Sequence, residues 1–598
     1  MSYTTFAVVM VATFASTAWA VRQTEDASTR LHDLFRERHE WQMRQFPEWA
    51  MARGDYTHAD RITDNSLLAI EQRHRDTQGF LQRLHDIDRS ALDENDLINY
   101  ELFELELSNA IAGHRHRTFL APVSGRMGPQ QSIPQMAERV RFQNHTDYEN
   151  YLKRLEQTPA MVDDTIERMR LGLEEGRTPP RVVLEGLPIQ FRALLEGGGL
   201  SALEAPFSRI PASINERERA ALRLRFQSHS LPMVRDALTR FGAFITDEYL
   251  LHCRESIAAA DWPEGEAYYN HQLAVMTTTD MTAQQIHELG LAEVARIRAE
   301  MMDVIRRSDF YTKLHREKSW PSEDAMFAAF IDYLRTDPRF YHETEEALLA
   351  GYRAICKEVD GHMPRFFKTL PRLPYGVRPI PRFMAPTQTT AYYQQGDIRN
   401  GTAGFFYANT YRLDQRPKYE MIALAIHEAV PGHHHQIALA QELEDIPEFR
   451  RQAWFTAFGE GWALYSERLG IEMGLYADPY DDFGRLLYEM WRACRLVVDP
   501  GMHALGWSRE RAIDFMKSNT ALSELNIITE IDRYIAWPGQ ATAYKIGELK
   551  IRELRAMAEQ TLGDKFDIRE FHDVVLLAGA VPLTVLERRV GDWVQSRR

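Results

Sequence analysis

The sequence predicts a mainly α-helical protein with one small β-sheet. Apolar residues recur with helical spacing over residues 25–111 and 216–358, and again from Lys418 to the C-terminus. Between these stretches, residues 375–410 contain short apolar and aromatic runs separated by Pro, Gly and Asp, which is typical of strands and turns. We therefore expect a small sheet that leads directly into the helix beginning near Lys418.

The N-terminal segment is predicted to be an export signal. Residues 6–20 are apolar but too few to span a bilayer, and they end in Ala18-Trp19-Ala20, which resembles an A-x-A cleavage site. Residues 1–20 are thus expected to be removed before Val21, in the periplasm or outside the cell. No cysteine lies near the cleavage point, so a lipid anchor is not expected, and no later run is apolar enough to form a membrane span.

Composition excludes several classes of protein. The 598 residues include 71 Lys and Arg against 86 Asp and Glu, a net charge of −15 at pH 7. A general nucleic-acid binder would need a basic surface, so no nucleic-acid partner is expected. The three cysteines, Cys253, Cys356 and Cys494, are too few and too far apart for a disulfide framework and are expected to be buried and unpaired.

Residues 21–598 are expected to form one enzyme-like domain with two lobes. A helical N-terminal lobe should cover about residues 21–250, and a lobe that carries the candidate metal site should cover about 251–598. The oligomeric state cannot be predicted from these patterns.

A candidate metal site follows the apolar helix at residues 419–426. His427 and Glu428 are followed by Pro431, Gly432 and three successive histidines. In zinc peptidases two imidazoles bind zinc and an adjacent Glu activates water, but those histidines are four residues apart. His427 and His433 are six apart, about 120° off a shared helical face, so we expect Pro431-Gly432 to interrupt the helix and bring His433 to the metal.

An alternative for the second ligand is His434, which is seven residues from His427. It returns to the same face but lies about 10.5 Å further along a straight helix, too far to share one ion. The third ligand is predicted to be Glu460, which glycines flank and apolar residues follow. Glu467, two turns further along the chain, is the alternative.

These motifs together resemble the DUF885 family of gluzincin-type zinc metallopeptidases. The resemblance is carried by H-E-x-x-P-G-H at His427–His433, E-G-W-A-L-Y at Glu460–Tyr465, and the segments 499–507, 533–534 and 538–547. It implies a largely helical body around a deep cleft, similar in outline to thimet oligopeptidase and angiotensin-converting enzyme. Pro500 departs from the pattern, since Thr is expected there.

Peptide hydrolysis assigns roles to the remaining candidates. Zn²⁺, one ion per chain, would lower the pKa of a bound water, and Glu428 would take its proton and pass it to the leaving amine. The oxyanion needs a donor, for which the candidates are His503, Tyr534 and Tyr544, with His503 and Tyr544 favoured.

Substrate binding is predicted on the last strand before the metal helix. Tyr407 and Asn409 lie there, and an extended peptide could pair with this strand while Asn409 sets its register. Arg492 and Arg495 are expected to pair with carboxylates inside the fold rather than with a substrate C-terminus.

Two classes of function remain open. The first is zinc-dependent hydrolysis of peptide bonds in short peptides. The second is a metal-binding helical protein without turnover, or a metallohydrolase of small esters or amides. Glu428 favours turnover, because a protein that only holds zinc has no use for a carboxylate beside its ligand.

Overall fold

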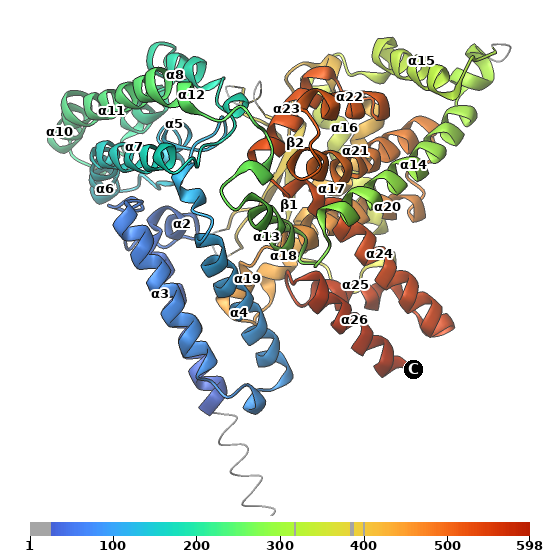
Figure 1. Ribbon diagram of the computed structural model, residues 1–598, viewed down its shortest axis with the longest axis horizontal. Helices are drawn as coiled ribbons and strands as arrows, with labels where there is room; N and C mark the ends of the chain where they lie inside the picture. The colour runs from blue at the N-terminus through green and yellow to red at the C-terminus, as the bar shows by residue number, and fades with distance from the viewer. Residues whose placement is uncertain (1–25, 316–318, 383–384, 386–387, 399–400) are drawn as a thin grey trace, which may run out of the picture. The chain divides into compact units, whose positions relative to one another are not determined.

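The computed structural model describes residues 26–315, 319–382, 385, 388–398 and 401–598 (Figure 1). The predicted signal at residues 1–20 and its cleavage point before Val21 lie outside the described residues. The fold is mainly helical with one small mixed sheet, which confirms the predicted fold class. The deep cleft stays a prediction.

The chain divides into two compact units, which are described separately here. One unit contains the chain through Ser256 together with residues 261–264 and 447–449, and the other contains residues 257–260, 265–446 and 450–598. The candidate metal ligands all lie in the second unit.

The first unit is built from helices. Residues 26–45 are helical, and the further α-helices are α2 (Pro47–Ala52), α3 (Leu67–His85), α4 (Glu94–His114), α5 (Pro129–Ser132), α6 (His145–Glu156), α7 (Thr158–Glu174), α8 (Leu187–Glu196), α9 (Ser201–Glu204), α10 (Glu216–Arg225), α11 (Leu231–Phe244) and α12 (Leu250–His252). Helix α4 begins after Asp93, whose side chain accepts a hydrogen bond from the Asp96 N–H, as expected for an N-cap. An apolar core that includes Tyr151, Phe226 and Phe241 lies between α6, α7 and α11.

The second unit carries the longer helices and the sheet. Its helices are α13 (Gly265–Thr277), α14 (Ala283–Arg307), α15 (Glu323–Thr336), α16 (Glu345–Phe366), α17 (Met421–Glu428), α18 (His433–Glu442), α20 (Thr456–Glu472), α21 (Pro479–His503), α22 (Arg509–Asn519), α23 (Glu524–Ala536), α24 (Ala543–Leu562), α25 (Ile568–Leu576) and α26 (Leu583–Arg597). The short helix α19 (Glu448–Arg451) straddles the division between the units.

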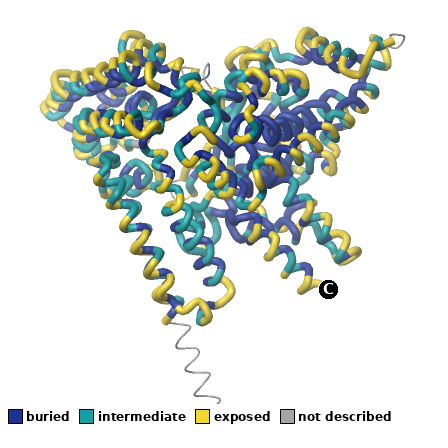
Figure 2. Tube along the Cα trace, in the orientation of Figure 1, coloured by how far each residue is buried: buried dark blue, intermediate teal, exposed yellow. Residues whose placement is uncertain are grey.

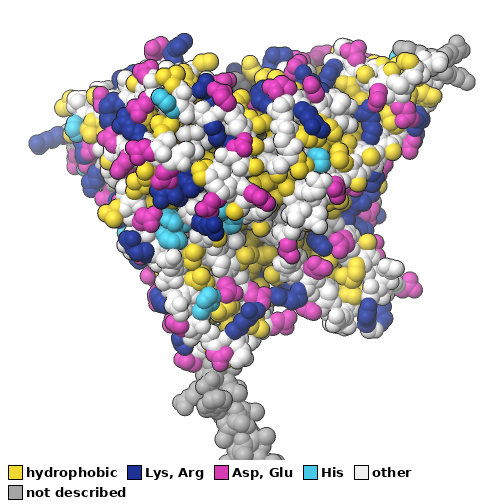
Figure 3. Space-filling model, viewed as in Figure 1, with side chains coloured by type: hydrophobic (Ala, Val, Ile, Leu, Met, Phe, Trp, Pro, Cys, Tyr) yellow, Lys and Arg dark blue, Asp and Glu magenta, His cyan; other side chains and the backbone are white. Residues whose placement is uncertain are grey.

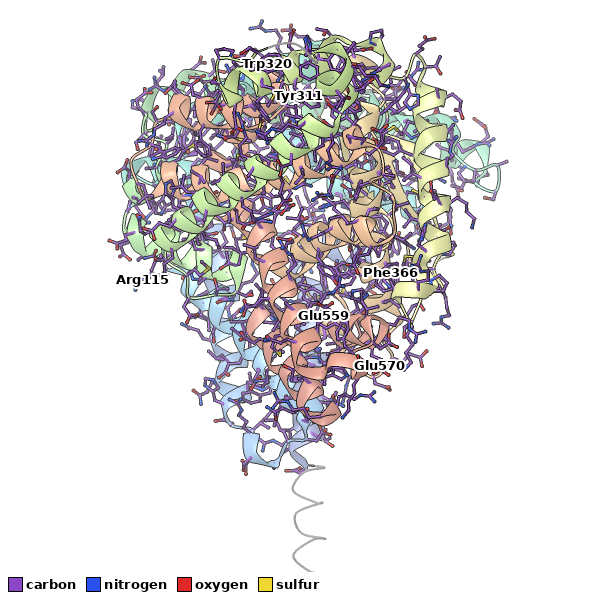
Figure 4. All side chains as sticks on the ribbon, turned by 90° about the vertical axis from the view of Figure 1, so that its right-hand side faces the viewer. Arg115, Tyr311, Trp320, Phe366, Glu559 and Glu570 are labelled. Carbon is purple, nitrogen blue, oxygen red and sulfur yellow. The ribbon has the colours of Figure 1, made fainter. Side chains whose placement is uncertain are left out.

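Helices α17, α20 and α21 form the buried centre of the second unit. Helix α14 packs along α21, and α20 packs against both α17 and α24 (Figure 1). Figure 2 shows buried residues concentrated on these inner helices, and the whole of α21 from Phe483 to His503 is buried. In Figure 4, Phe366 marks the end of α16 beside α25, whose His572 Nδ1 lies 2.8 Å from the Phe366 carbonyl oxygen.

The sheet has three strands, β1 (Tyr375–Pro379), β2 (Ala391–Gln394) and β3 (Gly404–Ala408). Their order is β1-β3-β2, with β3 parallel to β1 and antiparallel to β2. The central position of β3 buries Phe406 and Ala408 completely. Strand β2 packs against α17, so the sheet lies beside the metal helix as predicted.

The cysteines agree with the sequence, and one face of the molecule shows how its charges are distributed. On the face drawn in Figure 3, basic side chains are interspersed with acidic ones and form no basic patch. The three cysteines are unpaired and buried. Within the described ranges, every helix is either too short or too polar to span a lipid bilayer.

Candidate metal centre

The metal helix is interrupted where the sequence predicts. Helix α17 ends at Glu428, and α18 begins at His433. Across the break, the Gly432 N–H donates to the Ile426 carbonyl (3.0 Å) and the His434 N–H donates to the Ala429 carbonyl (3.1 Å). These bonds skip more residues than helical ones, so the extra residues are accommodated in a loop. Only glycine fits at position 432, because an added Cβ would overlap the His427 carbonyl oxygen.

This break brings three candidate ligands together. The Nε2 atoms of His427 and His433 lie 3.6 and 3.3 Å from the same carboxylate oxygen of Glu460, and the two imidazole rings are 4.7 Å apart between centroids. Ligand atoms of a tetrahedral zinc with bonds of about 2.05 Å are about 3.3 Å apart. The group therefore has the dimensions of a three-ligand zinc site.

The charges of the group also suit a cation. The Glu460 oxygen Oε2 is buried and has no hydrogen-bond partner among the described residues. Burial alone would raise the pKa of the Glu460 carboxyl, but the two imidazoles hold it well below its usual range. A buried, ionised carboxylate oxygen without a hydrogen bond fits a metal ligand.

Glu467 contacts the ring nitrogen of His427 that faces away from the other candidate ligands. Its Oε1 lies 2.7 Å from His427 Nδ1, the nitrogen that faces away from Glu460, and 3.5 Å from a guanidinium nitrogen of Arg492. Metal-bound histidines commonly donate their second N–H to a carboxylate, which fixes the ring and strengthens it as a ligand. Glu467 thus lies behind the ligand set rather than in it, and its position two helical turns after Glu460 on α20 is the sequence signal for that role.

The other two histidines of the run point elsewhere. His434 Nδ1 lies 2.9 Å from the Tyr393 hydroxyl on β2, and its Nε2 lies 3.0 Å from the Leu373 carbonyl oxygen. His435 is fully buried against Phe367, 4.6 Å away between ring centroids. Burial lowers the pKa of His434 to about 4 and that of His435 to about 3, so both imidazoles are neutral. Neither joins the group of three.

Glu428 occupies the end of α17 beside His427. Its residue is 7% exposed, and no hydrogen bond or ion pair to its carboxylate is found in the part of the chain that the structure describes. A buried carboxylate without a protein partner requires water or a ligand. The position of Glu428 fits a carboxylate that binds a water molecule at the candidate metal centre.

Tyr544 is the predicted donor that lies near the group of three. Its hydroxyl accepts a hydrogen bond from the Gln540 amide at 3.4 Å, and its ring lies 4.4 Å below the Arg495 guanidinium. Burial and the negative charge of Glu460 raise the pKa of Tyr544, so the hydroxyl is protonated at neutral pH and can donate.

Tyr534 and His503 are engaged in the protein interior. The Tyr534 hydroxyl donates to Glu530 at 2.8 Å and accepts from Arg495 at 2.8 Å. His503 accepts from the Ala259 N–H at 3.1 Å, and its other nitrogen lies 3.0 Å from the Tyr534 carbonyl oxygen. Both residues are fully buried, so we assign them a structural role and keep only Tyr544 as a donor.

Residues 47–590 match the family described as "Bacterial protein of unknown function (DUF885)". The chain belongs to this family. Among solved structures, it is similar to a putative lipoprotein from Colwellia psychrerythraea, at 28% identity and a TM-score of 0.86 over 95% of this chain and 99% of the other. It is also similar to a putative lipoprotein of unknown function from Shewanella oneidensis, at 18% identity and a TM-score of 0.73 over 94% and 99%. A search of curated proteins found no match.

In this DUF885 protein, the prediction that a peptide pairs with the strand containing Tyr407 is wrong. Strand β3, which contains Tyr407, is the central strand and pairs with β1 on one side and β2 on the other. It therefore has no edge left for a peptide. Tyr407 stacks on Tyr392 of β2, with ring centroids 5.1 Å apart.

Asn409 is also unavailable for setting a substrate's register. Its side-chain amide donates to the carbonyls of Ala385, Gln388 and Thr389 at 2.9 to 3.2 Å, and its oxygen accepts from the Tyr411 N–H at 2.9 Å. Three of these bonds hold the loop before β2 and the fourth holds the turn after β3. Asn409 is 1% exposed, so its side chain is not presented to a substrate.

Proposed function

We propose that this DUF885 protein is a zinc-dependent peptidase that hydrolyses peptide bonds in short peptides. One observation carries the proposal: two imidazole nitrogens and one carboxylate oxygen meet at zinc-ligand spacing, directly beside the buried Glu428, whose carboxylate has no partner among the described residues. A site that only stored zinc would be closed by a fourth protein ligand, whereas three ligands leave a position for water.

His427, His433 and Glu460 would hold the zinc ion, one per chain. When bound there, zinc would make water acidic enough to attack at neutral pH and would polarise the scissile carbonyl. Glu467 keeps the His427 ring oriented toward the ion through its 2.7 Å contact with Nδ1.

Glu428 acts as the general base. It accepts a proton from the water as the new C–O bond forms, and then passes that proton to the amine nitrogen, so that the peptide C–N bond breaks and the amine leaves. The Tyr544 hydroxyl donates a hydrogen bond to the oxygen of the scissile carbonyl as negative charge develops on it. Its raised pKa keeps that proton in place at neutral pH.

An extended peptide can be held by β2 instead of β3. Strand β2 is an edge strand of the three-stranded sheet and packs against α17. A peptide that adds to this edge would pair its backbone with β2 and run alongside the helix that carries His427 and Glu428. This arrangement supports peptides, rather than small esters, as the substrates.

The proposal is tested with a mixed library of short peptides. Zinc-loaded protein should cleave members of the library, and mass spectrometry gives the cleavage positions. A chelator should abolish this cleavage, and added zinc should restore it. Zinc-loaded protein that cleaves no peptide in a broad library would exclude the proposal and favour metal binding without peptide turnover.

Export of the protein is part of the proposal. Residues 6–20 and the A-x-A site support a cleaved signal, and both solved relatives are described as putative lipoproteins. For this chain we propose cleavage at the A-x-A site, before Val21. N-terminal sequencing of the natively expressed protein should begin at or near Val21; a start at Met1 or Ser2 would contradict it.

A further inference from the structure

Two buried arginines near the metal centre share one carboxylate. Arg495 lies 3.1 Å from Glu530, and Arg533 contacts the same carboxylate through two nitrogens at 2.9 and 3.2 Å. Pairing of Arg495 inside the fold was expected from the sequence, but here a single negative charge serves two positive ones. The cluster therefore carries about one excess positive charge.

Burial makes this excess charge unfavourable. The side chains of Arg495, Arg533 and Glu530 are 5%, 12% and 2% exposed, and Nη1 of Arg495 has no hydrogen-bond partner among the described residues. A buried charge is tolerated when it is paired and hydrogen-bonded, and an unpaired one is costly. The arrangement therefore favours a further anion.

Asp499, a buried carboxyl group that interacts electrostatically with Arg533, does not supply a full negative charge. Asp499 accepts hydrogen bonds from the Tyr269 hydroxyl at 2.6 Å and the Gly539 N–H at 3.1 Å. Burial raises the pKa of Asp499 to about 7, so at neutral pH it carries only part of a charge. The Tyr534 hydroxyl also faces Glu530 but is neutral.

Hydrogen bonds connect Arg533 of this cluster to Gln540 and Gln540 to Tyr544. Nη1 of Arg533 donates to the Gln540 side-chain oxygen at 2.7 Å, and the Gln540 amide nitrogen donates to the Tyr544 hydroxyl at 3.4 Å. Each of these two nitrogens keeps a second N–H. Tyr544 in turn lies within electrostatic range of Glu460. Tyr544 thus contacts Gln540 and the Arg495 guanidinium of this cluster and also interacts electrostatically with the candidate ligand Glu460.

We propose that Arg533 and Gln540, with Arg495 behind them, bind the free C-terminal carboxylate of a peptide substrate. This inference rests on the proposed peptidase function and narrows its substrates. With the carboxylate at Arg533 and the scissile carbonyl between Tyr544 and the metal ligands, water cleaves a bond close to the C-terminus. The products are the shortened peptide, with a new carboxylate, and a free amino acid or dipeptide.

The test compares two forms of one peptide. An N-acetylated peptide taken from the best library substrate is prepared with a free C-terminal carboxylate and with a C-terminal carboxamide, and kcat/KM is measured for both. An arginine–carboxylate contact corresponds to about 10-fold to 100-fold in affinity. Wild-type protein should therefore prefer the free acid by about that factor, and the products should be C-terminal amino acids or dipeptides.

Variants locate the preference. Arg533→Gln should raise KM for the acid far more than for the amide and so bring the acid-to-amide ratio close to 1. Gln540→Leu should lower the ratio by a smaller factor. Arg509→Gln is the matched control. Arg509 makes a comparable two-nitrogen contact with Asp532, which neighbours Arg533 on α23 but is not part of the cluster. The acid-to-amide ratio of this variant should equal that of wild type.

The outcomes are distinguishable. Equal cleavage of acid and amide by wild type, or cleavage at internal bonds only, would overturn this inference and leave the peptidase intact. A ratio unchanged in folded, zinc-containing Arg533→Gln would also overturn it. Absence of cleavage of both N-acetylated peptides, when the unblocked library peptide is cleaved, would overturn this inference and leave the peptidase intact. Absence of cleavage throughout the library would overturn the proposed function and this inference with it. The wild-type comparison needs no variant, so it decides the matter even where Arg533→Gln does not fold.

Discussion

Gly461 of α20 and Gly547 of α24 meet backbone to backbone: a Cβ added to Gly461 would lie 2.5 Å from the Cα of Gly547. Glu460 directly precedes the first of these glycines, and Tyr544 lies one turn before the second. The close helix crossing is therefore what brings a candidate ligand and a candidate oxyanion donor into one site.

Gly547→Ala should separate the two helices. Its Cβ would overlap the Ala457 carbonyl oxygen, which a flexible side chain cannot relieve, so we expect a loss of about 1 to 3 kcal/mol in unfolding free energy, typical of overpacking. Peptide cleavage should fall even where the protein is still folded. Gly361→Ala on α16 is the matched control, because nothing lies within 4 Å of its added Cβ; urea unfolding should find it as stable as wild type or more so.

His433 and His434 should differ in their effect on zinc. His433→Ala removes a ligand and should reduce zinc content well below one per chain, measured by metal analysis after gel filtration. His434→Ala should retain zinc, because both nitrogens of His434 face the sheet side, at Tyr393 and Leu373. Loss of zinc in His434→Ala with retention in His433→Ala would reverse the assignment.

Glu428→Gln and Glu460→Gln should separate catalysis from metal binding. Glu428→Gln cannot accept a proton, so peptide cleavage should fall by about 10²-fold to 10⁴-fold while zinc content and Tm stay near wild type. Glu460→Gln removes an anionic ligand and should weaken zinc binding and activity together. Full activity in Glu428→Gln would contradict the proposed base.

Zinc affinity should depend on pH through His427. Burial lowers the pKa of His427, but Glu460 and Glu467 outweigh it and raise the pKa to about 9. In metal-free protein this raised pKa adds stability below the ordinary value of about 6.5, and that stability is lost as the pH rises through about 9. Zinc must displace the proton, so affinity should rise by up to about tenfold per pH unit between these values and then level off.

Glu467→Gln is the control for this pH dependence. It removes one of the two carboxylates that stabilise the protonated His427 ring, so the pH at which zinc affinity levels off should fall. Competition titrations with a chelator at several pH values give both curves. Coincident curves for the variant and wild type would show that Glu467 does not act on His427.

The parts of the site that local geometry determines could be predicted from the sequence. A separation of six positions between His427 and His433 does not fit a straight helix, and Pro431-Gly432 is the place where the helix can break, so the interruption could be predicted from the local sequence. Glu460 could be chosen because glycines and apolar neighbours surround it.

The parts that depend on pairing between distant segments could not be predicted. Nothing in the sequence around Tyr407 reveals that β3 becomes the central strand, since the order of the strands is set by contacts with segments far away in the chain. Tyr534 and His503 look like donors in a motif, yet the Tyr534 hydroxyl accepts from Arg495, 39 residues away, and His503 accepts from the Ala259 N–H, 244 residues away. Such bonds become visible only in the folded structure.

The burial of the three-histidine run also affects how the protein is handled. His433, His434 and His435 are 8%, 1% and 0% exposed, so in the folded protein this run does not present adjacent imidazoles to an immobilised nickel resin. Unfolding exposes all three at once and creates a short metal-affinity tag within the chain. Untagged protein that passes through such a resin when native and is retained in denaturant would therefore report, by chromatography alone, whether the core around α18 is intact.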